Sequence, residues 1–139
     1  MRGTGRVASA ERLKRNRDFS RVYRHGVYRS GRWLGLHAFS YGGKSRKKPS
    51  RVGFTVSRAI RGAVPRNRAR RLLKESFRLS GVEIASGYDL IATARWQPEN
   101  EPALMLLTDE ISRMLVGSGA GFWQTDPKED QAGFVRDEN

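Results

Sequence analysis

The sequence predicts an α+β fold, a two-layer α/β sandwich with a sheet on one side and helices on the other. Segments in which apolar residues recur at helical spacing alternate with shorter segments in which they recur at every second position. The expected order along the chain is helix, strand, strand, helix, strand, helix. The length of 139 residues suits one domain with one modest core, and no internal repeat is visible.

The first predicted helix runs from about Arg17 to His25. Asn16 can cap its N-terminus, and Gly26 can end it. Phe19 and Tyr23 lie on its apolar side. Packing into the core is the simpler interpretation of these two rings. Stacking against bases of a single-stranded nucleic acid is the alternative, because arginines are interleaved with the aromatic residues.

Two strands joined by a basic loop are expected next. The strand from Arg32 to Tyr41 is apolar on one face, and its other face is rich in aromatic rings. Two glycines and a proline in the loop 42–50 would break any regular element. In the strand from Arg51 to Val56, the outer face has small residues that leave room for a ligand. The aromatic face of the first strand presents Trp33, His37, Phe39 and Tyr41.

A basic helix is the feature around which the rest of the chain is organised. It is predicted from about Pro65 to Leu79, since proline suits a first helical turn and Gly81 follows the end. Few acidic residues lie three or four positions away from its basic ones. An ordinary solvated helix usually mixes both signs, so the pattern favours a helix that binds a polyanion. The apolar side contains Ala69, Leu72, Leu73 and Phe77, and the opposite side Asn67, Arg71, Lys74 and Arg78.

A strand from Tyr88 to Arg95 and a helix from Pro102 to about Val116 complete a domain expected over residues 12–116. Residues 1–11 are expected to form a flexible basic N-terminal segment, and residues 117–139 a disordered acidic tail. Two hydrophobic residues of that tail are unexplained by the pattern, Trp123 and Phe134.

Positive charge is concentrated in the first part of the chain. Residues 1–78 contain 23 Lys and Arg against three Asp and Glu, a difference of +20, whereas residues 79–139 contain four against eleven, a difference of −7. Such a basic half would be stabilised by a polyanion, which makes nucleic acid the first expected partner and an anionic membrane surface the second. The membrane is disfavoured because the side of the basic helix opposite to its charges is predicted to pack into the core, so it is not exposed to lipid.

Catalytic and metal-binding patterns are missing from the sequence. The absence of cysteine excludes disulfides and thiolate chemistry. His25 and His37 lie on different predicted elements, and no carboxylate is placed to orient either ring, so a two-histidine ribonuclease site is the disfavoured alternative to a binding protein. No apolar run is long enough for a membrane span or a signal peptide, and a cytoplasmic location is expected.

The chain from about Arg12 to Leu115 resembles the protein subunit of bacterial ribonuclease P. The most specific match is Gly62-Ala63-Val64, then Arg66-Asn67-Arg68, Arg70-Arg71 and Phe77. The segments RLKRNRDFSRVYRHG, RVGFTVS and YDLIATAR follow in the order and spacing of that family. The resemblance implies a fold in which the strand–helix–strand unit around the basic helix has a left-handed crossover, although general handedness rules favour a right-handed one.

The resemblance also implies a function. A catalytic RNA would cleave precursor tRNA endonucleolytically, and this protein would bind the 5′ leader and stabilise the complex of RNA and substrate. The protein itself would bind no cofactor, while Mg²⁺ held chiefly by the RNA would supply the chemistry. One protein per RNA is expected, with no protein partner and no membrane. A ribosomal component or an RNA chaperone is the alternative, since either needs the charge but no aromatic cleft.

Two sets of site residues carry over from the family, and no catalytic or metal-binding residue is among them. His37 stands where a tyrosine is common in relatives, and an imidazole can still stack on a base. The residues expected to face the ribonuclease P RNA are Arg58, Arg61, Arg66, Asn67, Arg68, Arg70, Arg71 and Lys74. The residues expected to bind the 5′ leader, in a cleft between the first helix and the sheet, are Phe19, Tyr23, His37 and Ser57.

Overall fold

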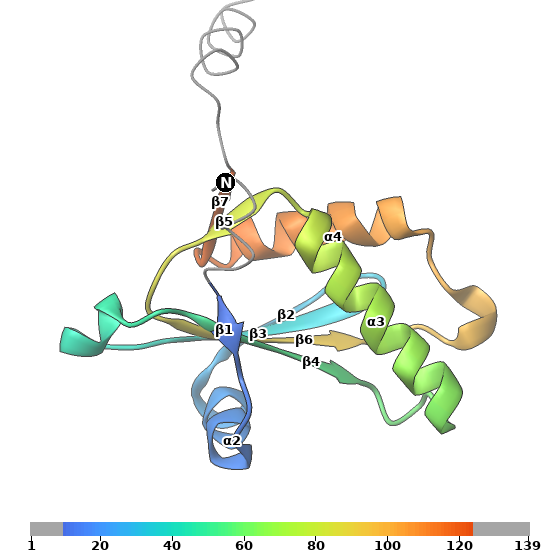
Figure 1. Cartoon of the computed structure of the whole chain (residues 1–139), viewed down its shortest axis with the longest axis horizontal. Coiled ribbons are helices and arrows are strands. Elements are labelled where there is room, and N and C mark those ends of the chain that lie inside the picture. Colours follow the sequence, from blue (N-terminus) through green and yellow to red (C-terminus); the bar gives the residue numbers. More distant parts are fainter. Residues whose placement is uncertain (1–9, 124–139) are drawn as a thin grey trace, which may run out of the picture.

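A mixed five-stranded sheet forms the centre of the molecule in the computed structural model, which describes residues 10–123 (Figure 1). Its strands are β1 (Glu11–Arg12), β2 (Val27–Ser30), β3 (Leu34–Ser40), β4 (Arg51–Val56) and β6 (Tyr88–Ala94). Their spatial order is β1-β4-β6-β3-β2. β4 is parallel to β1 and β6, whereas β3 is antiparallel to β6 and β2.

Three α-helices pack against this sheet. They are α2 (Asn16–His25), α3 (Ala63–Leu79) and α4 (Leu104–Gly117). Short 3₁₀ helices span Gly43–Lys47 and Pro98–Asn100, and a separate antiparallel pair consists of β5 (Val82–Ile84) and β7 (Gly121–Trp123). β4 and β6 are parallel neighbours, so α3 lies in the crossover connection that joins them.

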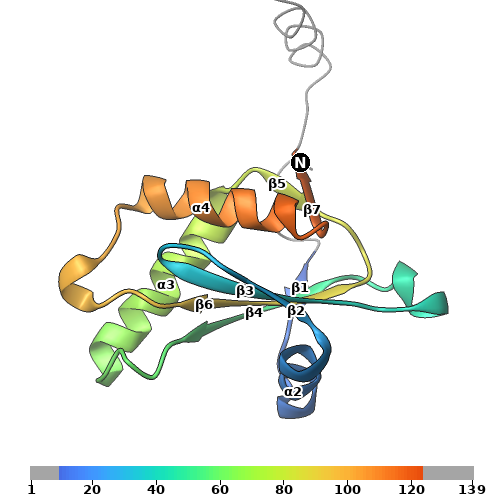
Figure 2. The ribbon, with the colours of Figure 1, turned by 180° about the vertical axis from the view of Figure 1, so that it is seen from behind.

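The helices cover both faces of the sheet, and the expected two-layer sandwich is therefore wrong. α3 and α4 lie on one face and α2 on the other, as both views show (Figures 1 and 2). The physical reason lies in the central strand β6. Leu90 and Ala92 point toward α3 and α4, Ile91 points toward α2, and all three are at most 1% exposed. A strand that is apolar on both faces must be covered on both.

The larger core lies between the sheet and the helices α3 and α4, and a small one lies under α2. Leu73, Leu107 and Ile111 are fully buried in the larger core. Glu110 of α4 is also buried there, and its carboxylate accepts the backbone N–H groups of Trp33 and Leu34 at 2.9 and 3.0 Å. α4 is thereby held to the turn between β2 and β3. The small core consists of Leu13, Val22 and Ile91, with Phe19 and Phe39 packed against it.

Most boundaries of the long elements agree with the sequence predictions, and the short strands were not predicted. β4 has the predicted limits, and α3 begins two residues before Pro65. The four short strands β1, β2, β5 and β7 were missed because two to four residues show no usable period. β2 in addition is exposed along its whole length. The loop 42–50 contains a 3₁₀ turn, so the expectation that its glycines and proline exclude any regular element was wrong.

The two ends of α2 differ from the predicted caps. Asn16 is the first helical residue, and the capping position is taken by Arg15 without a side-chain hydrogen bond. Gly26 does follow the last helical residue, in an extended conformation, and its N–H donates to the Val22 carbonyl at 2.8 Å. A Cβ at this position would lie 2.6 Å from that carbonyl oxygen and 3.0 Å from that of Ala38. Close packing of two backbones therefore requires glycine here.

The described part of the chain extends beyond the expected domain limits at both ends. Glu11 already pairs with β4, and α4 reaches Gly117. Ala120 is fully buried and its carbonyl accepts the Ala85 N–H, after which β7 pairs with β5. The described elements therefore continue past residue 117, where the tail was expected to begin. Trp123 is the last described residue, and the predictions for residues 1–9 and 124–139, Phe134 included, lie outside the described residues.

Candidate nucleic-acid interface

The outer side of α3 presents a basic surface. Asn67 and Arg71 are exposed, while Arg70 and Lys74 are partly exposed. Together with Val64 these four residues line an open depression of about 520 Å³. Arg70 donates a hydrogen bond to the Asn67 amide oxygen at 3.0 Å, which holds one guanidinium over the depression. These residues share one side of the helix, as the helical pattern predicts; that this side faces a polyanion stays a prediction.

Like charges crowd around Lys74. Partial burial lowers the pKa of its ammonium group, and the nearby guanidinium groups of Arg12 and Arg70 lower it further. Within residues 10–123 no carboxylate forms an ion pair with any of these three cations. Such an arrangement destabilises the free protein, and a bound polyanion would remove that cost.

Arg66 has a different environment from the other arginines of the signature. Its guanidinium is partly buried and donates to the backbone carbonyls of Val56, Ser57 and Ile60, at 3.1, 2.9 and 2.8 Å. Three of its donor contacts thus connect the start of α3 to the end of β4. The contacts indicate a positioning role for Arg66, which the sequence pattern did not suggest.

The remaining predicted RNA-facing residues are exposed. Arg68 forms a two-pronged ion pair with Glu101, with nitrogen–oxygen distances of 2.7 and 2.8 Å, so a phosphate would have to compete with that carboxylate. The same contact raises the pKa of Arg68 and lowers the pKa of Glu101. Arg58 and Arg61 are exposed in the turn before α3. Gly62 then begins the helix with a φ of 97°, a value that favours glycine.

An aromatic surface lies on the opposite side of the sheet, beside α2. The rings of Tyr23 and His37 meet edge to face with centroids 4.9 Å apart, and the ring of Tyr28 of β2 is tilted against His37 with centroids 4.5 Å apart. Tyr23 and Tyr28 are each 47% exposed. Next to them, the hydroxyls of Thr55 and Thr93 bond each other at 2.8 Å. The structure thus combines two exposed rings with small polar residues.

His37 is the central member of this aromatic surface. Its Nδ1 is buried and has no hydrogen-bond partner among the described residues. Burial lowers the pKa of the imidazole below its ordinary value of 6.5, so the ring is neutral at pH 7. A neutral ring in contact with two tyrosines can present an apolar face to a base.

Phe19 and Ser57 are not joined to Tyr23 and His37 by any described contact. The Phe19 ring packs over Gly53 of β4 and against the small core, so the core interpretation of this residue has support from its contacts. The Ser57 hydroxyl accepts the Ala59 N–H at 3.1 Å within its own turn. Of the four predicted leader residues, the structure brings together only two.

Two residues of the aromatic surface were missed by sequence reasoning. Tyr28 lies in the unpredicted strand β2, and Arg95 follows β6. The Arg95 guanidinium donates to the Tyr28 hydroxyl at 2.9 Å and to the Ser30 hydroxyl at 2.6 Å. The alternation of Tyr28 and Ser30 was a possible signal, but it spans too few residues to stand out.

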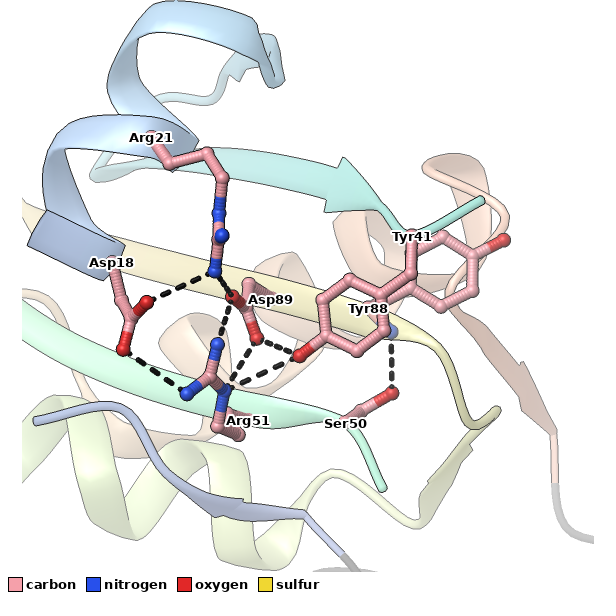
Figure 3. Close-up of polar contacts among 7 residues, drawn as sticks. All are labelled: Asp18, Arg21, Tyr41, Ser50, Arg51, Tyr88 and Asp89. Atoms are coloured by element: carbon pink, nitrogen blue, oxygen red, sulfur yellow. Dashed lines mark hydrogen bonds and ion pairs between the residues drawn. The ribbon is translucent and has the colours of Figure 1, made fainter. Parts of the chain in front are cut away.

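A polar network anchors α2, the helix that contains Tyr23, to the sheet (Figure 3). Asp89 of β6 is fully buried and accepts two hydrogen bonds from Arg51 of β4, at 2.9 and 2.7 Å. The other guanidinium nitrogen of Arg51 donates to Asp18 of α2 at 3.1 Å, and Arg21 donates to the same carboxylate at 2.9 Å. Tyr41 donates its hydroxyl hydrogen to Asp89.

In residues 10–123 no three His, Asp or Glu side chains lie together as a metal site would require. In the same part of the chain, no helix is both long and apolar enough to cross a bilayer.

The fold and the two surfaces define a class of protein: a basic α+β protein with a helix whose outer side is basic and a separate aromatic surface. Comparison with known proteins is more specific. The sequence model of the family described as Ribonuclease P matches residues 7–115. The ribonuclease P protein component of Clostridium kluyveri is 33% identical over 110 residues, which are 78% of this chain and 94% of that protein. That of Chloroflexus aurantiacus is 37% identical over 106 residues, 76% of each chain.

Solved structures agree with the sequence matches. The ribonuclease P protein of Staphylococcus aureus has a TM-score of 0.59 and 27% identity, over 76% of this chain and 93% of that one. The chain belongs to the bacterial ribonuclease P protein family. It is thus the protein component of an endoribonuclease that matures the 5′ ends of tRNA, and it associates with the ribonuclease P RNA.

Proposed function

We propose that the chain binds the 5′ leader of precursor tRNA on the surface formed by Tyr23, Tyr28 and His37. The observation that carries the proposal is the pair of half-exposed tyrosines around a neutral imidazole, on a sheet face that also offers hydroxyl groups. Unpaired bases are recognised by stacking on aromatic rings, whereas a duplex offers no free base face. The 5′ leader is a single-stranded extension of the substrate, so its bases are free to stack.

The basic side of α3 would face the ribonuclease P RNA in this arrangement. Its cations lack acidic partners within the described residues, apart from Arg68 and Arg78. Sheet and helix separate the two surfaces, since α2 and α3 lie on opposite faces (Figures 1 and 2). One protein could therefore contact the catalytic RNA and the leader at once, in a one-to-one complex that stabilises the bound substrate.

The chemistry of cleavage belongs to the RNA in this proposal. The described residues do not form a cluster that fits Mg²⁺, and the ions would be held chiefly by RNA. The protein then contributes affinity and orientation through its folded part, which was expected over residues 12–116 and continues to β7 in the structure. It would act in the cytoplasm, without a cofactor or a protein partner of its own. We assign no catalytic residue to it.

Cleavage of a labelled precursor tRNA by a bacterial ribonuclease P RNA at low magnesium tests the proposal. Correct 5′ maturation should depend on the protein. Tyr23→Ala should weaken the binding of leader-bearing tRNA by roughly 1–3 kcal/mol, the value of one lost base stack, and leave leader-free tRNA unchanged. Phe122→Ala is the matched control, because Phe122 is equally half exposed but lies on β7. Equal losses for both tRNA forms would contradict the leader assignment.

A further inference from the structure

A groove between β1 and α3 does not include Tyr23, Tyr28 or His37, although Phe19 of α2, one of the residues predicted to bind the leader, also lines it. It has a volume of about 410 Å³, within the range of pockets that bind small organic groups. Its apolar floor includes Leu13, Val52 and the pair Phe54 and Phe77, whose rings meet edge to face at 5.5 Å. Such a floor suits the flat face of a ring. A phosphate group alone would make no contact with it.

Cations surround this floor. Arg12, Arg70, Lys74 and Arg78 line the groove, with Glu11 as the one acidic residue among its described lining. Arg78 is paired with Glu75, but the other three cations have no ion-pair partner within residues 10–123. The mutual repulsion at Lys74 described above is centred on this groove. An anionic group and an apolar ring together match this combination of charge and floor.

The edge of β4 supplies hydrogen-bonding groups to the same groove. β1 pairs with β4 only at Arg51 and Val52, and the last link is the Leu13 N–H to the Val52 carbonyl at 3.0 Å. Alternate residues of a parallel strand direct their N–H and C=O groups to the same side. Phe54 is therefore the next residue whose backbone faces this edge, at a point where β4 has no strand neighbour. An open strand edge can pair with the polar edge of a base.

We propose that the groove binds one unpaired nucleotide of the ribonuclease P RNA, with its base on the apolar floor and its phosphates between Arg12, Arg70 and Lys74. This inference rests on the proposed function, in which α3 faces that RNA. Arg70 and Lys74 line both the groove and the depression on the outer side of α3, so a strand that follows the helix reaches the groove. A base inside a duplex could not reach the floor, and the nucleotide must be bulged or looped out.

A short hairpin RNA with one bulged 2-aminopurine tests the proposal on the full-length protein. The bulged hairpin should bind about tenfold more tightly than the same hairpin without the bulge, as expected for one added base stack. The fluorescence of the 2-aminopurine should fall on binding, because stacking quenches it. Equal affinities and an unchanged fluorescence would overturn the proposal.

Two variants locate the nucleotide. Ala10→Trp fills the groove without a change of charge, and Lys74→Gln removes a cation from its rim. Both should reduce the ratio of bulged to paired affinity to near one. The matched control is Ala103→Trp, at an exposed position before α4, which should retain the full ratio. Retention of the ratio in both groove variants would overturn the assignment of the nucleotide to this site.

Two further outcomes separate this proposal from the function on which it rests. A protein that stimulates precursor cleavage but shows no preference for the bulge would refute the groove alone. A protein that prefers the bulge but does not stimulate cleavage would refute the proposed function. If Ala10→Trp instead weakens a single-stranded leader oligonucleotide and spares the bulged hairpin, the groove belongs to the leader and the proposal is wrong.

Discussion

At the scale of single residues, Asp89 has the most demanding environment in the described part of the chain. Its carboxylate is 0% exposed and is balanced by Arg51, with further contacts from Tyr41 and Arg21. Burial of a charge is unfavourable unless partners and hydrogen bonds compensate for the lost water. Because Arg51 also bonds Asp18 of α2, the same network sets the position of the helix that carries Tyr23.

Replacing Asp89 should destabilise the fold strongly. Asp89→Asn keeps the shape but removes the charge that Arg51 requires, and we expect a loss of about 3 kcal/mol in the free energy of unfolding. Urea unfolding followed by circular dichroism measures this. Asp109→Asn is the control, since Asp109 pairs with Arg113 on the surface at 2.8 Å and that loss should be small. Comparable losses for both variants would contradict the role of the buried network.

Tyr41 should titrate at unusually high pH. Its burial, and the hydrogen bond that it donates to Asp89, raise the pKa of the phenol to about 12 from an ordinary value of about 10. The folded state therefore holds this proton more tightly than the unfolded state does. The resulting stability is fully present below about pH 10 and is lost as the pH rises through about 12.

Near-ultraviolet absorbance follows the ionisation of the four tyrosines. The component near pH 12 should disappear in Tyr41→Phe. Its persistence in that variant would assign the high pKa to another tyrosine.

At the scale of elements, α3 contains arginines in two different environments. Arg71 is exposed on the depression, whereas Arg66 donates to three carbonyls, one at the end of β4 and two in the turn that follows it. The helical pattern treats both simply as basic residues of one signature. Only the path of the turn between β4 and α3 distinguishes them, since that turn brings the carbonyls back to the start of the helix.

Substitution of these two arginines should separate stability from RNA binding. Arg66→Ala should lower the free energy of unfolding by roughly 1–2 kcal/mol, because carbonyls lose their donor. Arg71→Ala should leave stability nearly unchanged and reduce the slope of log K against log salt for RNA binding by about 0.7–0.9, the effect of one lost phosphate contact. Urea unfolding and salt-dependent RNA titrations measure the two effects. An unchanged salt slope in Arg71→Ala would remove that residue from the interface.

At the scale of the whole molecule, the sheet separates two surfaces of different chemistry. The basic side of α3 and the aromatic surface beside α2 lie on opposite faces (Figures 1 and 2). A protein with this arrangement can bridge two RNA segments without either one covering the other. Apart from the central sheet, β5 and β7 form a small antiparallel pair. Next to this pair, Ala120 is fully buried and Leu115 of α4 packs near Gly121.

Truncation should show that β7 belongs to the folded domain. A chain that ends at residue 116 loses β7 and the cover that it gives to Val82 and Ile84, and we expect a loss of about 1–3 kcal/mol in the free energy of unfolding. A chain that ends at residue 123 keeps the pair and should be as stable as the full chain. Thermal and urea unfolding of the three chains distinguish these cases. Equal stability of the two truncated chains would make β7 dispensable.

The sequence by itself determined the elements with a long, clear period and the sites that follow from charge. The limits of β4, the extent of α3 within two residues, its basic side, and the family all follow from local patterns. The aromatic residues Tyr23 and His37 were predicted to share one site, and they do lie together. The roles of these residues in RNA binding stay predictions, as does the left-handed sense of the crossover through α3.

Only the tertiary structure decided which residues meet across the chain. The face to which α2 packs depends on the double-sided burial of Ile91 and Leu90 in β6, and no pattern within α2 contains that information. The use of Arg66 by three carbonyls and the separation of Phe19 from His37 likewise depend on contacts between distant segments. Periodicity reports which side of an element is apolar, whereas its neighbours are set by the packing of the whole sheet.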